Sequence, residues 1–271
     1  MCAANATDAA SVQDDESVRI DVVAERDALV PGTTTFVGVR FRIAPKWHTY
    51  WDGLNDTGVA PRVTFDAVEG LTFGPAMIPA PHRMYGIEGI TDYIHEDEVT
   101  LVVPVTVAEG VTGGSVTLKA SCEWLVCDAN ICVLGDGVAE ATLPVRASAD
   151  RAAEQASAIE SARRRVAIRP ESRSELAALG IRTSWSSQRM TVRAPGATRL
   201  AFYPHETSSR PLNPRGDGVA EGTALRVTFE PSEEQSEGEI VARGVLHVQS
   251  PADGGEGVRD RWIWIDSAPA G

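Results

Sequence analysis

The alternation of apolar and polar residues over short segments is the feature that most constrains how this chain folds. Val18, Ile20 and Val22 alternate with polar residues. The same period of two continues through Thr34–Ile43 and Ser115–Trp124. Such alternation is typical of half-buried strands, and Gly, Pro, Asp or Asn bounds each segment. Because no helical pattern separates these strands, the first half of the chain is predicted to be a β-sandwich.

The chain has 271 residues, which favours two domains of ordinary size. Residues 1–16 are small, polar and acidic, and we expect a disordered leader there. Residues 17–147 form the predicted first sandwich. Residues 148–170 are rich in Ala and charged side chains, which predicts a helical linker. The β pattern returns in residues 171–271, so we predict an all-β chain of two sandwich domains joined by a short helix.

Charge and hydropathy argue against nucleic acid as a partner and against a segment that spans a membrane. The net charge is −13, which disfavours nucleic acid because phosphate binding needs clustered Lys and Arg. The longest apolar segments, such as Val99–Val107, are too short to span a bilayer. We therefore expect no transmembrane segment.

Three of the four cysteines, Cys122, Cys127 and Cys132, lie close together in the sequence. Asp128 and Asn130 favour a turn between Cys127 and Cys132, so the segment is predicted to be a hairpin with one cysteine on each arm. Facing residues in such a pair have Cα atoms about 4.5–5.5 Å apart, within the roughly 4.4–6.8 Å that a disulfide accepts. An accessible bridge of this kind suits thiol–disulfide exchange, in which a thiolate attacks one sulfur and the second cysteine resolves the mixed disulfide.

Several alternatives remain open for the cysteines. The Cys127–Cys132 pair is equally compatible with an inert structural disulfide. Zinc binding by three cysteines lacks a fourth ligand at normal spacing. Cys122 shares strand parity with apolar residues, which favours a buried small hydrophobe over a third redox group. Cys2 is either a lipidation position exposed by signal removal or a chance cysteine in the leader.

Three blocks of sequence resemble one family. They are PKWHTYWDGLNDTGVAP at Pro45–Pro61, IPAPHRMYGIEGITDY at Ile78–Tyr93 and WLVCDANIC at Trp124–Cys132. Their content and order resemble the DsbD N-terminal (alpha) domain family, and its ScsB-like branch in particular. Weaker similarity continues into the second predicted domain at Leu200–Pro204 and Gly244–Val248.

The resemblance implies an immunoglobulin-like fold for both domains and a function. Such modules are periplasmic thiol:disulfide interchange proteins that relay reducing equivalents from a membrane or thioredoxin-like donor to oxidised envelope proteins. The resemblance therefore implies a disulfide reductase component with Cys127 and Cys132 as its catalytic pair and no metal or organic cofactor. It also implies a cell-envelope location, with or without a lipid anchor at Cys2.

The resemblance further implies a cap loop over the cysteines, formed here by Arg83, Met84, Tyr85 and Gly86. Two departures affect it. Val133 and Leu134 stand where the family often has Pro after the second cysteine. Pro81, His82 and Arg83 replace acidic residues that precede the cap in some members, so no carboxylate stands at that position to give acid–base help.

Aromatic side chains near the blocks have two interpretations. One is a wall around the cysteines, formed by Trp47, His48, Trp51 and Trp124, or a docking face on the cluster of Trp47, His48, Tyr50 and Trp51. The other is packing in the core, as is common for large aromatics. A histidine beside a cysteine would favour the thiolate.

Two other functions compete with interchange. One is a non-catalytic β-sandwich lipoprotein that binds another envelope protein, with Cys127–Cys132 as a staple. The other is a zinc- or copper-binding envelope protein that uses the thiolates.

Overall fold

The computed structural model describes residues 11–12, 17–149, 152–213, 218–230, 240–252, 254 and 256–269. The chain divides into two compact units. The first comprises residues 1–51, 59–79 and 95–166, and the second comprises residues 52–58, 80–94 and 167–271. Nearly all regular structure is antiparallel β, which confirms the predicted all-β, immunoglobulin-like class. Among the described residues, no helix has the length and apolar character that a membrane span requires.

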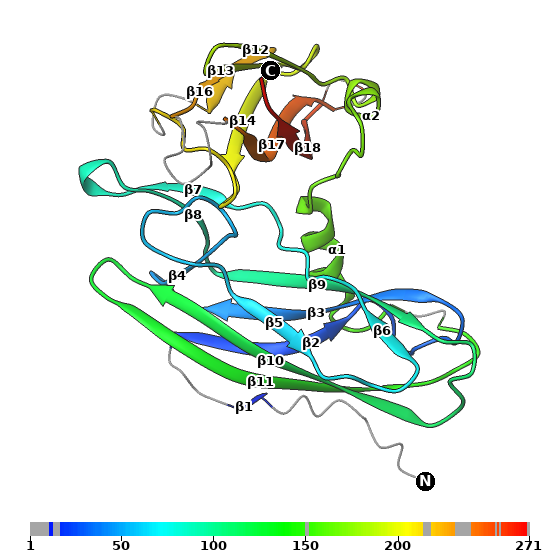
Figure 1. Ribbon diagram of the computed structural model, residues 1–271. Helices are drawn as coiled ribbons and strands as arrows, with labels where there is room; N and C mark the ends of the chain where they lie inside the picture. The colour runs from blue at the N-terminus through cyan, green and yellow to red at the C-terminus, as the bar shows by residue number, and fades with distance from the viewer. Residues whose placement is uncertain are drawn as a thin grey trace. The chain divides into compact units, whose positions relative to one another are not determined.

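The first unit is a sandwich of two sheets, which Figure 1 shows as two layers of strands. One sheet has the order β1–β11–β10–β4, and β5 also pairs with β10. Its strands are β1 (Ser11–Val12), β11 (Cys132–Pro144), β10 (Ser115–Cys127), β4 (His48–Tyr50) and β5 (Arg62–Phe65). The other sheet has the order β2–β3–β9–β6. Its strands are β2 (Val18–Ala24), β3 (Thr34–Ile43), β9 (Glu98–Val107) and β6 (Leu71–Phe73).

Alternate residues of both sheets meet in one hydrophobic core. Val39 and Phe41 of β3 are fully buried, as are Leu118 and Val126 of β10. The burial of every second residue along β10 follows directly from its alternating sequence. The outward face of β10 is therefore free to carry other side chains, and this is the face that bears Cys127.

Helix α1 (Ala156–Arg165) packs on the first unit, against β9, β2 and β3. Its buried residue Ile159 contacts a cluster that includes Val23 and Val102. Gly38 allows this approach, because a Cβ there would lie 3.0 Å from Ile159 Cδ1 and 2.6 Å from the Leu101 carbonyl oxygen. The segment is helical, as its composition predicts, and it is part of the first unit.

The second unit contains two further sheets around a separate core. One sheet has the order β12–β13–β16, from strands β12 (Arg182–Ser186), β13 (Arg189–Arg193) and β16 (Ala224–Thr228). The other has the order β15–β14–β17–β18, from strands β15 (Val219–Glu221), β14 (Arg199–Pro204), β17 (Ala242–Pro251) and β18 (Val258–Ser267). A short helix, α2 (Arg173–Ala178), begins at Ser172, whose side chain accepts a hydrogen bond from the Glu175 amide.

The hairpin of β7 (His82–Tyr85) and β8 (Thr91–His95), with the 3-10 turn η1 (Ile87–Gly89), belongs largely to the second unit although its sequence lies inside the predicted first domain. Ser11–Val12 pairs with β11 where we expected a disordered leader. Cys2 and the other residues of that leader lie outside the described residues. The boundaries 17–147, 148–170 and 171–271 stay predictions.

Candidate functional site

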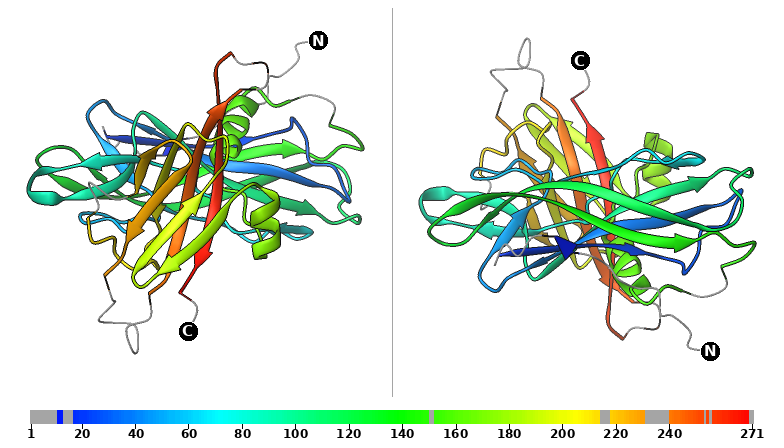
Figure 2. Two further views of the ribbon diagram at one scale, coloured as in Figure 1. Left: turned by 90° about the horizontal axis from the view of Figure 1, so that it is seen from above. Right: turned by 90° about the horizontal axis from the view of Figure 1, so that it is seen from below.

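The β10–β11 hairpin carries the predicted cysteine pair at its turn. The two strands pair along their whole length, from Ser115↔Pro144 to Cys127↔Cys132, and they run side by side, in green, in the right-hand view of Figure 2. Asp128 shapes the turn, because its Oδ1 accepts hydrogen bonds from the amides of Asn130 at 2.7 Å and Ile131 at 2.8 Å. This is the local Asx geometry that Asp favours, so the predicted hairpin is confirmed.

Cys127 and Cys132 face each other directly in this register and are joined by a disulfide. Their Cα atoms are 4.1 Å apart. The backbone hydrogen bond from Asp128 to Ile131 makes the cysteines the adjacent non-hydrogen-bonded pair, in which facing residues approach most closely.

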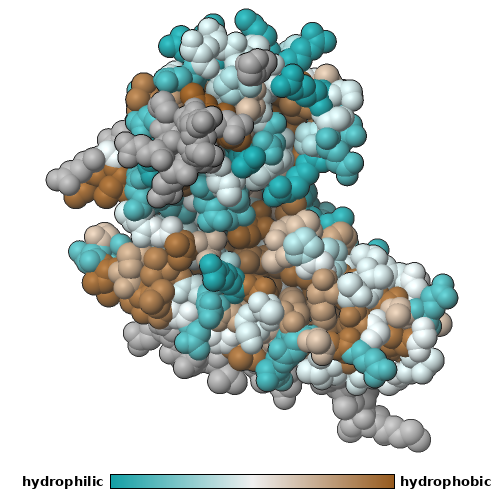
Figure 3. Space-filling model, viewed as in Figure 1, coloured by the Kyte–Doolittle hydropathy of each residue, from teal (hydrophilic) through white to brown (hydrophobic). Residues whose placement is uncertain are grey.

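The two ends of the disulfide have different environments. Cys127 is 3% exposed, whereas Cys132 is an exposed residue. Two apolar neighbours of Cys132 are also exposed, Ile131 at 57% and Leu134 at 80%. In Figure 3, hydrophobic residues gather at the end of the first unit where this hairpin turns. Cys132 is therefore the accessible end of the disulfide, and the exposed side chains of Ile131 and Leu134 form an apolar rim near it.

Strand β4 places two polar aromatic side chains beside the buried sulfur. His48 is the direct pairing partner of Cys127, and Tyr50 lies two residues along on the same face. The Tyr50 hydroxyl donates a hydrogen bond to Cys127 Sγ at 3.0 Å. His48 Nε2 lies 3.3 Å from the Tyr50 oxygen. His48 is thus the one residue of the predicted wall that the structure brings to the pair. Tyr50 belongs to the predicted aromatic cluster but was not among the predicted wall residues, and its spacing of two from His48 is the signal that places it on the same face.

Asp128, which directly follows Cys127, is the acidic residue of the turn. Hydrogen bonds from the Ile131 and Asn130 amides lower its pKa, and the charge of His48 contributes in the same direction. The Asp128 carboxylate is therefore anionic near the disulfide at neutral pH.

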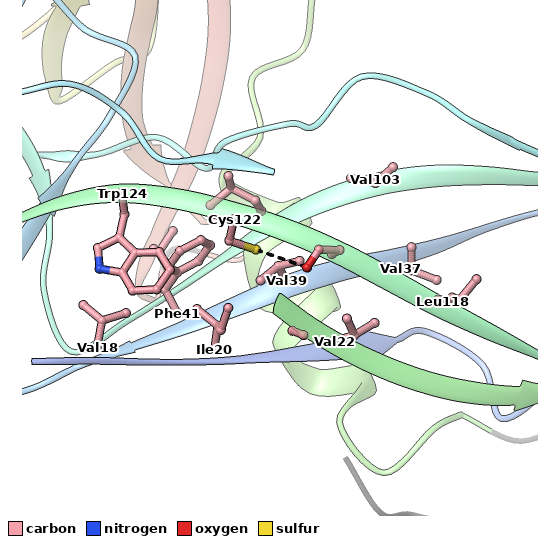
Figure 4. Packing of buried hydrophobic residues seen from close by; sticks show 14 of the residues in the cluster. Val18, Ile20, Val22, Val37, Val39, Phe41, Val103, Leu118, Cys122 and Trp124 are labelled. Atoms are coloured by element: carbon pink, nitrogen blue, oxygen red, sulfur yellow. Dashed lines mark hydrogen bonds between the residues drawn. The ribbon is translucent and has the colours of Figure 1, made fainter. Parts of the chain in front are cut away.

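The tryptophans of the predicted wall are placed elsewhere. Trp124 is 4% exposed and packs edge-on against Phe41 with ring centroids 5.8 Å apart. Figure 4 shows its ring among the core residues of β2 and β3. It therefore lies on the opposite face of β10 from Cys127 and does not line the site. Trp47 packs against the same core, and Trp51, which directly follows β4, is buried.

Cys122 lies in the core beside Trp124, as Figure 4 shows. Burial raises the pKa of its thiol to about 12. A thiol that is protonated and enclosed in this way is inert, so the structure places Cys122 among the small hydrophobes.

The predicted cap residues are held within the second unit. The Arg83 guanidinium lies over the rings of Tyr93 and Tyr203, at 5.6 and 5.4 Å from their centroids, and donates to the Phe202 carbonyl oxygen. Tyr85 is 45% exposed, and Met84 and Gly86 are half-buried. The cap function of these four residues stays a prediction.

No group of three His, Cys, Asp or Glu side chains is arranged to hold a metal ion in the described part of the chain. The donor atoms of the cysteine pair are joined to each other, and the third thiol lies in the core.

Comparison with known proteins relates residues 19–144 to a family. Residues 19–144 match the family described as "Thiol:disulfide interchange protein DsbD, N-terminal". The N-terminal periplasmic domain of ScsB from Proteus mirabilis is similar in structure over 97% of this chain and 98% of its own, with a TM-score of 0.57 and 15% identity. The reduced DsbD N-terminal domain of Neisseria meningitidis covers 49% of this chain and 89% of its own, with a TM-score of 0.32 and 16% identity.

A further match is the DsbD N-terminal domain in complex with the PilB N-terminal domain, also from Neisseria meningitidis. It is 18% identical, covers 49% of this chain and 88% of its own, and has a TM-score of 0.27. A search of curated proteins gave no match. Residues 19–144 follow the family's sequence pattern, and the disulfide lies at the predicted position. This chain therefore carries a DsbD N-terminal family domain.

Proposed function

We propose that this chain is a thiol–disulfide interchange module that relays reducing equivalents from a membrane or thioredoxin-like donor to oxidised envelope proteins through Cys127 and Cys132. The observation that carries the proposal is the asymmetry of the disulfide. One cysteine is exposed at a hairpin turn, and the other is buried against a hydroxyl donor.

This asymmetry assigns a role to each sulfur. A donor thiolate attacks the exposed Cys132 Sγ, the Cys127–Cys132 bond breaks, and its electron pair stays on Cys127 as a thiolate. The donor's second thiol then attacks the donor sulfur of the mixed disulfide and releases Cys132 as a thiolate. The donor is oxidised to a disulfide and the module is reduced by two electrons. The reverse sequence reduces an oxidised partner.

The apolar rim of Ile131 and Leu134 supports a protein partner, since exposed apolar side chains beside a reactive group are typical of docking surfaces. The structural match to a periplasmic domain supports a place in the cell envelope. The proposal also includes lipid attachment through Cys2, which lies outside the described residues.

The test uses thioredoxin that lacks its resolving cysteine, so that a mixed disulfide accumulates. The expected product is a covalent complex linked through Cys132, identified by peptide mapping. Cys132→Ser and Cys127→Ser are the matched variants, and neither has a disulfide to attack. No complex with the wild-type chain under conditions that reduce a labile control disulfide would contradict interchange, and would favour the binding lipoprotein with a structural staple.

A further inference from the structure

The Tyr50 hydroxyl donates a hydrogen bond to the buried sulfur of the pair. Tyr50 is 1% exposed, and its oxygen lies 3.0 Å from Cys127 Sγ. A tyrosine hydroxyl has a single proton, and that proton is directed to sulfur. With that proton directed to the sulfur, the Tyr50 oxygen is left to accept from the tautomer of His48 that carries a proton on Nε2, the arrangement that the inference requires at this 3.3 Å contact.

This hydrogen bond changes in strength during the reaction. A disulfide sulfur is a weak acceptor, whereas a thiolate is charged, and hydrogen bonds to charged groups are roughly twice as strong as neutral ones. The contact is therefore weaker in the oxidised ground state than when negative charge develops on Cys127. An interaction of that kind lowers the barrier, because it favours the transition state over the ground state.

We infer that Tyr50 is a catalytic residue that stabilises Cys127 as the leaving thiolate, and that His48 is the positioning residue that holds the Tyr50 hydroxyl toward the sulfur. The inference rests on the proposed function and specifies one step of it. As the attacking thiolate bonds to Cys132 Sγ, the electron pair of the breaking bond moves to Cys127 Sγ, and the Tyr50 proton faces that charge. In the reverse direction the same contact is released as the disulfide re-forms.

The charged and titratable groups around the sulfur make this hydrogen-bond donor useful. Asp128, the acidic group beside the pair, is anionic and opposes a thiolate, although its exposure lets solvent screen it. His48 and Tyr50 are the titratable groups on the paired strand β4. Without the Tyr50 hydroxyl, the Cys127 thiolate would form in a buried site, and burial raises a thiol pKa.

Tyr50→Phe removes the hydroxyl and keeps the ring. The rate at which dithiothreitol reduces the full chain is measured by trapping the free thiols. The pKa of the Cys127 thiol is read from thiolate absorbance in a Cys2→Ser, Cys132→Ser background. We expect the rate of reduction to fall roughly three- to tenfold, because a leaving thiol of higher pKa leaves more slowly. We expect the Cys127 pKa to rise by about one unit, the equivalent of a hydrogen bond to a charged group. Tyr203→Phe removes a hydroxyl from the second unit and should change neither quantity.

His48 is tested by a pair of variants. His48→Gln retains an N–H near the position of Nε2 and should keep most of the wild-type rate. His48→Leu removes the donor and should behave like Tyr50→Phe. A merely structural role for His48 would make both variants equally slow.

The outcomes separate this inference from the proposed function. If Tyr50→Phe has the wild-type rate and thiol pKa, Tyr50 only packs against the sulfur and the inference is wrong, while interchange stands. If dithiothreitol fails to reduce the wild-type disulfide on the timescale of exchange-active proteins, the proposed function itself fails. A lower rate together with a higher pKa in Tyr50→Phe supports both.

Discussion

Gly135 is a position where the hairpin that carries the disulfide tolerates no side chain. It pairs with Trp124 across β10 and β11. A Cβ added there would lie 2.4 Å from Trp124 Cε2 and Nε1. The indole ring has no room to retreat, because it is buried and packs against Phe41. Gly135→Ala must therefore displace the ring or the strand.

The expected cost follows from overpacking. Forcing extra atoms into a well-packed core costs about 1–3 kcal/mol. Since each 1.4 kcal/mol is about tenfold in an equilibrium constant, local opening of the hairpin should become roughly 5- to 150-fold more frequent. Hydrogen exchange of β10 and β11 amides, measured by mass spectrometry, reports this opening without assuming that the two units unfold together.

Gly110→Ala is the matched control, because a Cβ there meets no atom within 4 Å and the position has no positive φ. Its exchange in β10 and β11 should match wild type within about 0.5 kcal/mol. The reasoning fails if Gly135→Ala exchanges like Gly110→Ala, since the indole would then accommodate a methyl group without strain.

Other outcomes follow from single contacts. Burial raises the pKa of Tyr93 from 10.0 to about 12. The contribution of the neutral Tyr93 hydroxyl to stability should therefore be complete below pH 10 and lost as pH rises toward 12. Absorbance at 295 nm against pH checks this, and ionisation of Tyr93 near pH 10 would refute it. Asp92→Ala removes the acceptor of three hydrogen bonds from Asp56 and Thr57. Urea unfolding should show the second unit destabilised by about 2–4 kcal/mol. No change in stability would mean that water replaces Asp92 as the partner of Asp56 and Thr57 without cost. Leu134→Asp should slow reduction by thioredoxin several-fold more than reduction by dithiothreitol, because only the protein docks on the apolar rim. Equal slowing of the two reactions would show that thioredoxin does not dock on this rim.

Much of the first unit could be predicted because its strands are half-buried and alternate in polarity. The structure has a strand at Thr34–Ile43, where the alternation predicts one, and a hairpin turn between Cys127 and Cys132. These features depend on local sequence, namely period-two burial and the turn chemistry of Asp128.

The contacts that the sequence does not predict join distant segments. The Arg83 segment is held by Tyr93 and Tyr203, and the Asp56 carboxylate accepts from Arg210. No local pattern relates residue 56 to residue 210. Composition likewise could not separate Trp124 from His48, because both are aromatic neighbours of the blocks and only strand parity places them on opposite faces.

Tyr50 shows the same limit at the site. His48 and Tyr50 are two residues apart and so share a strand face, but the sequence does not show that β4 lies beside β10 with His48 opposite Cys127. Strand pairing over that separation sets the hydroxyl against the sulfur, and it can be read only from the fold.

The reduction potential of the Cys127–Cys132 pair tests the central claim most directly. The chain is equilibrated in graded thiol buffers and its free thiols are trapped in a Cys2→Ser background; Cys122 does not interfere because it is buried with a thiol pKa of about 12. An electron carrier should have a potential of roughly −270 to −180 mV, between thioredoxin and protein disulfide isomerase. A value below about −300 mV would contradict interchange and identify the bridge as a structural disulfide.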